Sequence, residues 1–331
     1  MVCEQLREAV RDGGLLAGPE RLLAMISGGR DSTCLLDVLV ALRGPAEVTA
    51  MHVNYGLREE AGADQRQCEE LCERLGVELT VVPAARPTAD VAEAPVGERG
   101  PGNLQAWARE VRYHAAEELA RPSGALLVTG HTASDQVETI LYRLAASPGR
   151  RALLGMSARE GRLLRPLLGV TREQTAAYCR ERGLSWREDL SNEDERYART
   201  RVRGGLLPAL RAVHPAAEAN VLRTALLLRE ETELLQGLVG AEARDGAVAL
   251  ARLAEMPAAL ARMVVVRLAE DAVGGYVPQA GDRVAEILTL GRRGGRAELH
   301  VGGGAGAVVE GGVLRMVRLP ARTQGVPPGE D

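Results

Sequence analysis

Short apolar runs alternate with amphipathic stretches over the first 150 residues of the chain. A short run rich in Val, Leu and Ile is typical of a buried strand, and apolar residues at helical spacing are typical of a helix that covers a core. The runs predict strands at residues 21–26, 47–54, 77–82 and 125–129. The stretches between them predict helices at residues 32–42, 59–75, 103–120 and 134–145. This alternation predicts an α/β fold, in which a parallel sheet carries helices on both faces.

The pattern changes beyond residue 150. Residues 150–205 are rich in arginine and predict one helix near residues 171–182. A long helical stretch follows at 216–245, then helices near 257–272 and 279–290, and then short strands broken by glycine up to residue 319. We therefore expect a large domain of residues 1–205, a helical linker with a small α+β domain over residues 206–320, and a frayed tail of residues 321–331.

The composition is that of an ordinary globular chain with an unusual choice of basic residue. Lysine and phenylalanine are absent, so all 41 basic residues are arginine, and the formal net charge is -4. A generally basic nucleic-acid coat is therefore excluded, although a basic patch on one face stays open. The absence of lysine also excludes a catalytic lysine from this chain and a Walker P-loop, which requires a Gly-Lys pair.

The five cysteines and the polar N-terminal segment bear on the compartment. An odd number of cysteines, without an apolar signal segment, predicts reduced thiols and a cytoplasmic protein. Cys68 and Cys72 lie four residues apart on an expected helix, but no second pair with metal-ligand spacing accompanies them. No run of 18 uncharged apolar residues is present, so we expect no membrane span. The oligomeric state stays open, a homodimer included.

Residues 83–102 contain four prolines and three glycines and show little periodicity. Such a composition predicts a long loop, and loops of this length in a compact domain are usually lids or disordered segments. A mobile flap near the site and a passive insertion both remain open.

The strongest chemical signal is the segment SGGRDS, which follows the first expected strand and opens a helix. Its members are Ser27, Gly28, Gly29, Arg30, Asp31 and Ser32. The two glycines permit a tight turn, and the free N–H groups at a helix start can hold a phosphate. The carboxylate of Asp31 would repel bound phosphates unless a cation lies between them. Mg²⁺ can bridge carboxylate and phosphate oxygens, so Asp31 is the candidate metal ligand. The alternative is a plain Gly-Gly turn with a capped helix.

A second group of candidates follows the fourth expected strand. Asp135 and Glu138 are three residues apart, so they share one face of the helix that starts there. Ligands of parallel sheets bind at the carboxyl ends of the strands, and two carboxylates at that edge suit an ammonium ligand. The alternative is that both residues only complement the helix dipole. His131 is either catalytic or structural.

These segments and several others form an ordered set. SGGRDS resembles the PP-loop of the ATP pyrophosphatases, which split ATP into AMP and pyrophosphate while adenylating a substrate. The further segments are HVNYGLR at 52–58, GNLQAWAR at 102–109, GHTASDQVET at 130–139, LGM at 154–156, RPLL at 165–168 and DLSN at 189–192. As a set over residues 20–210, they resemble the tRNA(Ile)-lysidine synthetase family.

The resemblance implies a fold, a reaction and partners. The fold is that of the adenine nucleotide alpha hydrolase-like PP-loop domains, with residues 1–205 as the ATP-binding catalytic domain and 206–320 as a linker and tRNA-binding domain. The reaction joins free L-lysine to C2 of the wobble cytidine in the CAU anticodon of tRNA(Ile). ATP adenylates the C2 oxygen, the lysine ε-amine displaces AMP, and Mg²⁺ assists the departure of pyrophosphate.

The resemblance also implies roles for individual residues. The expected catalytic residues are Asp31, Arg109, His131, Asp135 and Glu138. The expected ATP contacts are the six residues of SGGRDS and His52, the latter through the backbone around residues 50–52. The expected lysine contacts are Asn103, Asp135 and Glu138, and the expected tRNA contacts are Arg199, Arg201 and Arg203. For Arg109 and for the arginine cluster, the alternative is an ordinary solvated helix face.

Four positions depart from the commonest pattern of the family. Tyr55 and Thr132 stand where histidine is common, Gln105 replaces a glutamate, and Ser134 replaces an aspartate. Serine caps a helix well, but the loss of one carboxylate weakens cation binding. We expect activity to survive on the three remaining carboxylates.

Three other functions compete with lysidine formation. A PP-loop tRNA 2-thiolation enzyme commonly needs paired cysteines, and the chain has no C-x-x-C. A catalytically inactive nucleotide-binding module would explain Ser134 but not the complete SGGRDS segment. A small-molecule amidotransferase-type synthetase would leave the arginine cluster without a purpose.

Overall fold

A computed structural model describes residues 2–56, 61–84, 104–147, 149–187, 198–292 and 294–320, without the side chains of Gln105 and Arg199. Most of the expected loop at 83–102, the DLSN segment and the tail at 321–331 lie outside these residues. The chain divides into two compact units, residues 1–228 and 229–331. The division falls within helix α11 (Ala217–Glu242), later in the chain than the expected boundary after residue 205.

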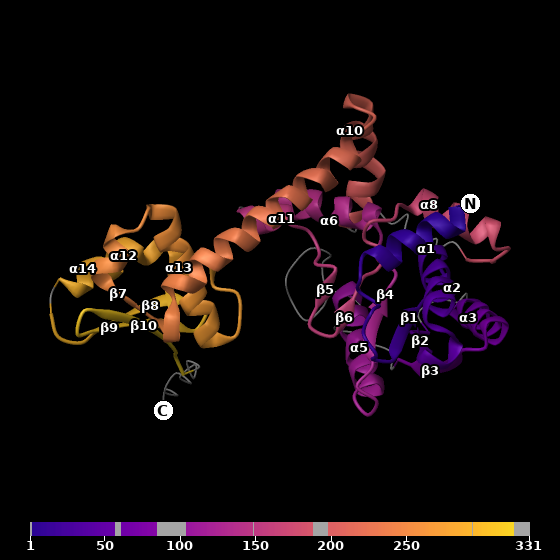
Figure 1. Cartoon of the computed structure of the whole chain (residues 1–331), viewed down its shortest axis with the longest axis horizontal. Helices are drawn as coiled ribbons and strands as arrows, with labels where there is room; N and C mark the ends of the chain where they lie inside the picture. Colours follow the sequence, from indigo (N-terminus) through magenta and orange to yellow (C-terminus); the bar gives the residue numbers. More distant parts are fainter. Residues whose placement is uncertain are drawn as a thin grey trace, which may run out of the picture. The chain divides into compact units, whose positions relative to one another are not determined.

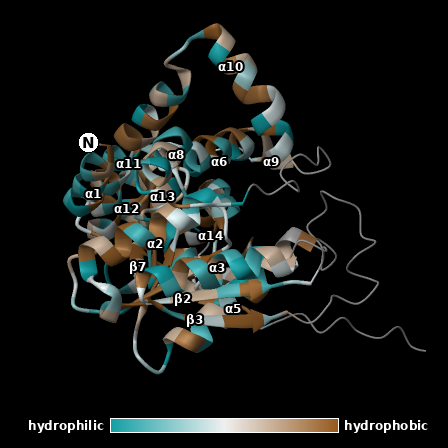
Figure 2. Cartoon of the chain, turned by 90° about the vertical axis from the view of Figure 1, so that its right-hand side faces the viewer, coloured by the Kyte–Doolittle hydropathy of each residue, from teal (hydrophilic) through white to brown (hydrophobic). Residues whose placement is uncertain are grey.

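The first unit contains an open sheet and its covering helices (Figure 1). Its strands are β1 Leu22–Ile26, β2 Val48–Asn54, β3 Glu78–Pro83, β4 Leu126–Thr129, β5 Arg159–Glu160 and β6 Leu163–Leu164. Its helices are α1 Val2–Asp12, α2 Arg30–Arg43, α3 Ala61–Leu75, α5 Leu104–Ala120, α6 Ala133–Ala146, α7 Arg150–Leu153, α8 Arg172–Glu181, α9 Ala198–Arg201 and α10 Leu207–Val213, with short helical turns η1 Pro45–Glu47 and η3 Val202–Leu206. Along helices such as α2 and α3 the hydropathy colouring alternates, as expected for amphipathic helices (Figure 2).

The strand order is β3-β2-β1-β4-β6-β5, and every pairing is parallel except the one between β5 and β6. Successive residues of β1 contribute to opposite cores. Leu22, Ala24 and Ile26 belong to a core shared with α1, α2, α3 and α8, whereas Leu23 and Met25 belong to a core shared with α5. The expected parallel sheet with helices on both faces is confirmed. β1 lies between β2 and β4, so the loops after β1 and β4 are neighbours at the carboxyl edge.

The second unit combines helices with a small antiparallel sheet of order β7-β10-β9-β8. Its elements after α11 are η4 Arg244–Gly246, β7 Ala247–Ala249, α12 Leu250–Glu255, α13 Ala258–Val273, η5 Pro278–Arg283, α14 Val284–Gly291, β8 Ala297–Gly302, β9 Ala305–Glu310 and β10 Val313–Arg318. Its core is formed by residues of α13, α14 and the sheet. The expected α+β character of this region is confirmed.

Two elements differ from the sequence prediction. Helix α1 was not expected, yet Cys3, Leu6 and Val10 form a buried stripe at helical spacing on it. The expected helix at 279–290 begins as the 3₁₀ turn η5, which contains Gly281, a weak helix former. In the described part of the chain, no helix is long and apolar enough to cross a membrane.

Candidate active site

The loop between β1 and α2 is held in one conformation by its two serines and a glycine. Gly28 has φ +77°, and a Cβ there would lie 3.0 Å from the backbone oxygen of Asp64, so only glycine fits without strain. The Ser32 hydroxyl donates to Gly29 O (2.8 Å) and accepts from the Ser27 N–H (3.1 Å). Gly29 is the N-cap residue of α2 and offers no side-chain acceptor to the helix start. The first N–H groups of α2 are therefore suited to an anion.

Asp31 lies in the first turn of α2 and faces helix α8. One of its oxygens, Oδ1, accepts from Thr175 Oγ1 (2.5 Å) and from Arg30 Nε (3.1 Å). The other, Oδ2, lies 3.7 Å from Arg172 Nε. Its side chain keeps 21% exposure, so the carboxylate lies at an accessible edge of the site.

Asp135 and Glu138 project from the first turns of α6, which follows β4. Thr132 is the N-cap residue, and Asp135 Oδ2 accepts from the Thr132 N–H and hydroxyl, both at 2.8 Å. This reciprocal cap leaves Asp135 Oδ1 directed elsewhere. Glu138 is almost fully buried, with a side-chain exposure of 3%. A carboxylate so deeply buried requires cationic partners.

Arg172 supplies the first of these partners and was not predicted from the sequence. It is the first residue of α8, whose start is set by a capping box between Thr171 and Gln174. Its guanidinium donates from Nη2 to Asp135 Oδ1 (2.5 Å) and from Nη1 to Glu138 Oε1 (2.6 Å). Together with its approach to Asp31, this brings the three expected carboxylates around one arginine.

The charge of Arg172 affects the ionisation of Asp135. Burial by itself would raise the pKa of the Asp135 carboxyl, but the attraction of Arg172 and the hydrogen bonds from Thr132 hold that pKa below its usual range. The pKa of Arg172 is raised in return, because the three carboxylates outweigh its burial. We therefore treat both groups as charged at neutral pH.

Arg203 supplies the second partner of Glu138. It lies in η3, a π-helical turn between α9 and α10 that contains a Gly-Gly pair. It donates from Nε to Glu138 Oε1 (2.8 Å) and from Nη2 to Oε2 (3.2 Å). π-Helical turns often mark functional sites, and this one connects the predicted arginine cluster to the carboxylates. Arg201 is exposed on the same segment, and the side chain of Arg199 lies outside the described residues.

The remaining predicted residues have other contacts or lie outside the described chain. Arg109 is exposed on α5, with its guanidinium 4.6 Å from the ring centroid of Tyr113. His131 Nδ1 lies 2.8 Å from Thr129 Oγ1. His52 is buried, its Nδ1 is 3.2 Å from Ile26 O, and burial lowers its pKa, so the ring is a neutral part of the core. Asn103 is not among the described residues.

Three of the four positions that depart from the family pattern have definite local partners, and the side chain of Gln105 lies outside the described residues. Thr132, not Ser134, is the N-cap residue of α6. Ser134 is buried and accepts from the backbone N–H of Arg172 (3.3 Å), so it attaches α6 to the start of α8. Tyr55 donates to Ala108 O (2.9 Å) and thereby joins the end of β2 to α5.

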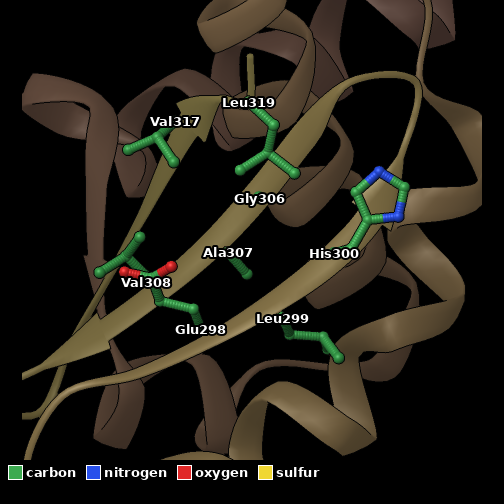
Figure 3. A pocket seen from close by; sticks show the side chains of 8 residues that line it. All are labelled: Glu298, Leu299, His300, Gly306, Ala307, Val308, Val317 and Leu319. Atoms are coloured by element: carbon green, nitrogen blue, oxygen red, sulfur yellow. The ribbon is translucent and has the colours of Figure 1, made fainter. Parts of the chain in front are cut away.

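The cysteines lie in the core beneath these residues, where Cys179 Sγ is 3.7 Å from Arg30 O and Cys68 Sγ is 3.4 Å from His52 Nδ1. All five cysteines are free and buried. Among the described residues, no group of three or more His, Cys, Asp or Glu side chains is arranged to hold a metal ion by itself. A hollow of ≈ 200 Å³ on β8, β9 and β10 includes none of the predicted site residues in its lining (Figure 3).

Comparisons with known proteins identify the family to which the chain is similar. The family model described as the PP-loop domain matches residues 2–210. The tRNA(Ile)-lysidine synthase of Nostoc sp. is 34% identical over 70% of this chain, and that of Salinispora tropica is 37% identical over 98% of this chain. The chain spans 46% to 66% of the length of several such relatives, but 96% of the Salinispora protein.

A solved structure shares the fold at low sequence identity. The U34-tRNA thiolase NcsA from Methanococcus maripaludis superposes with a TM-score of 0.55 at 15% identity, covering 69% of this chain and 80% of the thiolase. At this identity, the likeness concerns the fold alone.

Proposed function

Because the chain belongs to the tRNA(Ile)-lysidine synthase family of PP-loop proteins, we propose that it joins free L-lysine to C2 of the wobble cytidine in the CAU anticodon of tRNA(Ile). ATP adenylates the C2 oxygen and releases pyrophosphate. The lysine ε-amine then attacks C2, loses a proton and displaces AMP together with that oxygen. The observation that carries the proposal is the meeting of Asp31 with Asp135 and Glu138 around Arg172, at the carboxyl edge of β1 and β4.

The nucleotide half of the site is the SGGRDS loop. Its backbone N–H groups and the Ser27 and Ser32 hydroxyls are suited to the phosphates of ATP. Asp31 fits Mg²⁺, since it offers carboxylate oxygens at an accessible edge and Mg²⁺ in nucleotide sites takes one or two carboxylates, waters and phosphate oxygens. When bound, the ion neutralises charge on the departing pyrophosphate. Arg109 and the backbone near His52 complete the proposed nucleotide contacts.

The lysine half of the site is the carboxylate pair of α6. Asp135 and Glu138 would bind an ammonium group, and Asn103 would contribute a further contact. The amine must be neutral to attack, and its unperturbed pKa is about 10.4, so a base has to accept a proton. A carboxylate of this pair or His131 would accept that proton.

The RNA contacts beside these two halves would come from the arginine segment at α9 and η3, with Arg199, Arg201 and Arg203. Arginine is suited to phosphate contacts and to stacking on unpaired bases of an anticodon loop. The unit of residues 229–331 would hold the body of the tRNA. With a net charge of -4, such binding should be confined to one basic face and weaken with salt.

The alternative of 2-thiolation is disfavoured by the state of the cysteines. All five are buried. Burial raises the pKa of the Cys3 thiol to about 11 and that of Cys72 to about 12, and it also raises that of Cys68. Thiols that stay protonated at neutral pH are poor nucleophiles and poor cluster ligands, so sulfur transfer through them is not expected.

One incubation tests the proposed function. The protein is mixed with ATP, Mg²⁺, labelled lysine and a tRNA(Ile) that bears a CAU anticodon, and the digested RNA is searched by mass spectrometry for cytidine carrying lysine. D31N, D135N and E138Q should each lose at least about 10²-fold in turnover, the scale of one lost charge-stabilising group. E118Q, at an exposed glutamate of α5, is the matched control. Sulfur in place of lysine, or ATP binding without any product, would refute the proposal.

A further inference from the structure

The charges of the carboxylate cluster are already balanced by arginines of the chain. Three carboxylates, those of Asp31, Asp135 and Glu138, contact three guanidiniums, those of Arg30, Arg172 and Arg203, within the described residues. Arg172 is the member of this set that approaches all three carboxylates. A cation that arrives here therefore enters a site whose negative charge is compensated.

The acceptor positions of the lysine half are also largely occupied. Asp135 uses Oδ2 for two hydrogen bonds from Thr132 and Oδ1 for Arg172. Glu138 uses Oε1 for Arg172 and Arg203, and Oε2 for Arg203 again. A carboxylate has about four lone-pair sites, so few remain. An ammonium group that binds both carboxylates with full strength has to take the place of Arg172.

Arg172 has another group of ligands within reach. Its Nε lies 3.7 Å from Asp31 Oδ2, and Asp31 belongs to the loop whose N–H groups face the proposed phosphate positions. A guanidinium matches phosphate oxygens in geometry and charge. The side chain keeps 19% exposure and stands at the first residue of a helix, where a long side chain can change rotamer without moving the backbone.

We propose that Arg172 occupies the ammonium subsite in the absence of substrates, competes with lysine for Asp135 and Glu138, and moves to the nucleotide phosphates when ATP binds. This inference rests on the proposed function and adds a coupling between its two small substrates. When ATP arrives, the guanidinium of Arg172 leaves Asp135 and Glu138. The pair then carries a net negative charge, even with Arg203 still bound to Glu138, and this charge attracts the ammonium group of lysine. By linkage, lysine in turn favours ATP by the same factor.

Arg172 is not needed to build the helix that carries it. The Thr171–Gln174 capping box starts α8, and hydrogen bonds from Tyr178 and Arg182 to Asp37 attach it to α2. Loss of the Arg172 side chain should therefore leave the fold intact. Removal of the Arg172 side chain takes away a charge in the site, whereas removal of Asp37 would take away a contact that holds α8 in place.

The test is equilibrium dialysis of labelled lysine against the full chain at fixed ionic strength, with and without α,β-methylene-ATP and Mg²⁺. For the wild type, the nucleotide analogue should tighten lysine binding by about 5-fold or more, the lower range of allosteric couplings. R172Q should bind lysine about 10-fold more tightly without nucleotide, because one competing cation is gone, and the analogue should then change the affinity less than about 2-fold. R172K, which keeps the charge, should retain part of the coupling.

The control is R180Q, which removes an exposed arginine from the same helix and should behave as the wild type. Weaker lysine binding by R172Q without nucleotide would overturn the inference, since it would mean that Arg172 supports the subsite and does not compete for it. An unchanged coupling in R172Q would overturn it as well. If the wild type binds no lysine under either condition, the proposed function fails and this inference fails with it; the first two results leave the proposed function standing.

Discussion

The buried carboxylate of Asp37 provides the sharpest test of how the site is supported. Asp37 lies on α2, its side chain is 1% exposed, and it accepts from Tyr178 Oη (2.6 Å), from Arg182 Nε and Nη2 (both 3.0 Å) and from Arg7 Nη2 (3.3 Å). It thus ties α1 and α8 to α2. Removing one partner of a buried ion pair costs about 3–5 kcal/mol. Because Arg182 is 41% exposed and can be rehydrated, we expect about 2–4 kcal/mol for D37N.

The assay is urea unfolding followed by tryptophan fluorescence, because Trp107 and Trp186 both lie in the first unit. D12N, at an exposed aspartate at the end of α1, should change the free energy of unfolding by less than about 0.5 kcal/mol. A loss below about 1 kcal/mol for D37N would refute the reasoning, because it would mean that the buried charge is not held by its four donors.

The difference in the free energy of unfolding between the wild type and D37N should depend on pH in a defined way. Burial opposes ionisation of Asp37, but the hydrogen bonds from Arg182 and Tyr178 outweigh it and hold the pKa of the carboxyl below its ordinary value of 3.8. A lowered folded-state pKa means that the carboxylate stabilises the fold fully above that ordinary value and loses this contribution as the pH falls through the folded-state pKa. The advantage of the wild type over D37N should therefore be constant near neutral pH and shrink in acid. An advantage that grows in acid would contradict the assignment.

Three further predictions concern the loop, a neighbouring turn and the thiols. G28A should weaken binding of an ATP analogue by about tenfold or more, measured by calorimetry, and lower the free energy of unfolding by about 1–2 kcal/mol, measured in urea. The reason is that residue 28 has φ +77° and that the added Cβ would lie 3.0 Å from Asp64 O. G155A should cost about 1–2 kcal/mol more than G161A, since both glycines have positive φ but only the former would clash, 2.5 Å from Gln136 Oε1; equal losses would contradict this. Ellman's reagent should find fewer than about one fast-reacting thiol per native chain and all five after denaturation, since all five cysteines are buried; two fast thiols would contradict it.

The main elements of the first unit could be predicted because their burial leaves a mark on the sequence. Parallel strands buried on both faces are continuous apolar runs, as in β1, where all five residues are buried. Strands β5 and β6 have two residues each and leave no such mark. Helix α1 contains many charged residues, so its narrow buried stripe, Cys3, Leu6 and Val10, gives only a weak signal in the sequence.

The site was predictable to the extent that its residues follow strands directly. Asp31 follows β1, and Asp135 and Glu138 follow β4, so the adjacency of these two strands brings them to one edge. Arg172 has no such local signal, because it is one of 41 basic residues in a chain without lysine. The useful clue was the capping box TREQ, which marks the start of a helix with an arginine in its first position.

Helix α8 lies outside the segments that carry the family resemblance, yet it determines how the two halves of the candidate site meet. It contacts α2 at two levels, through Thr175 with Asp31 at the carboxyl edge of the sheet and through Tyr178 with Asp37 deeper in the core. The two aspartates are six residues apart on α2, which is about 9 Å along a helix. An anchor at that distance fixes the direction of α8, so that Arg172 at its start faces the carboxylates of α6. D37N should therefore weaken the coupling between ATP and lysine as well as the fold, whereas R172Q should remove the coupling and cost less stability than D37N, because Arg203 still pairs with Glu138 and Thr132 still donates to Asp135. Measuring both quantities on both variants separates support of the site from action within it.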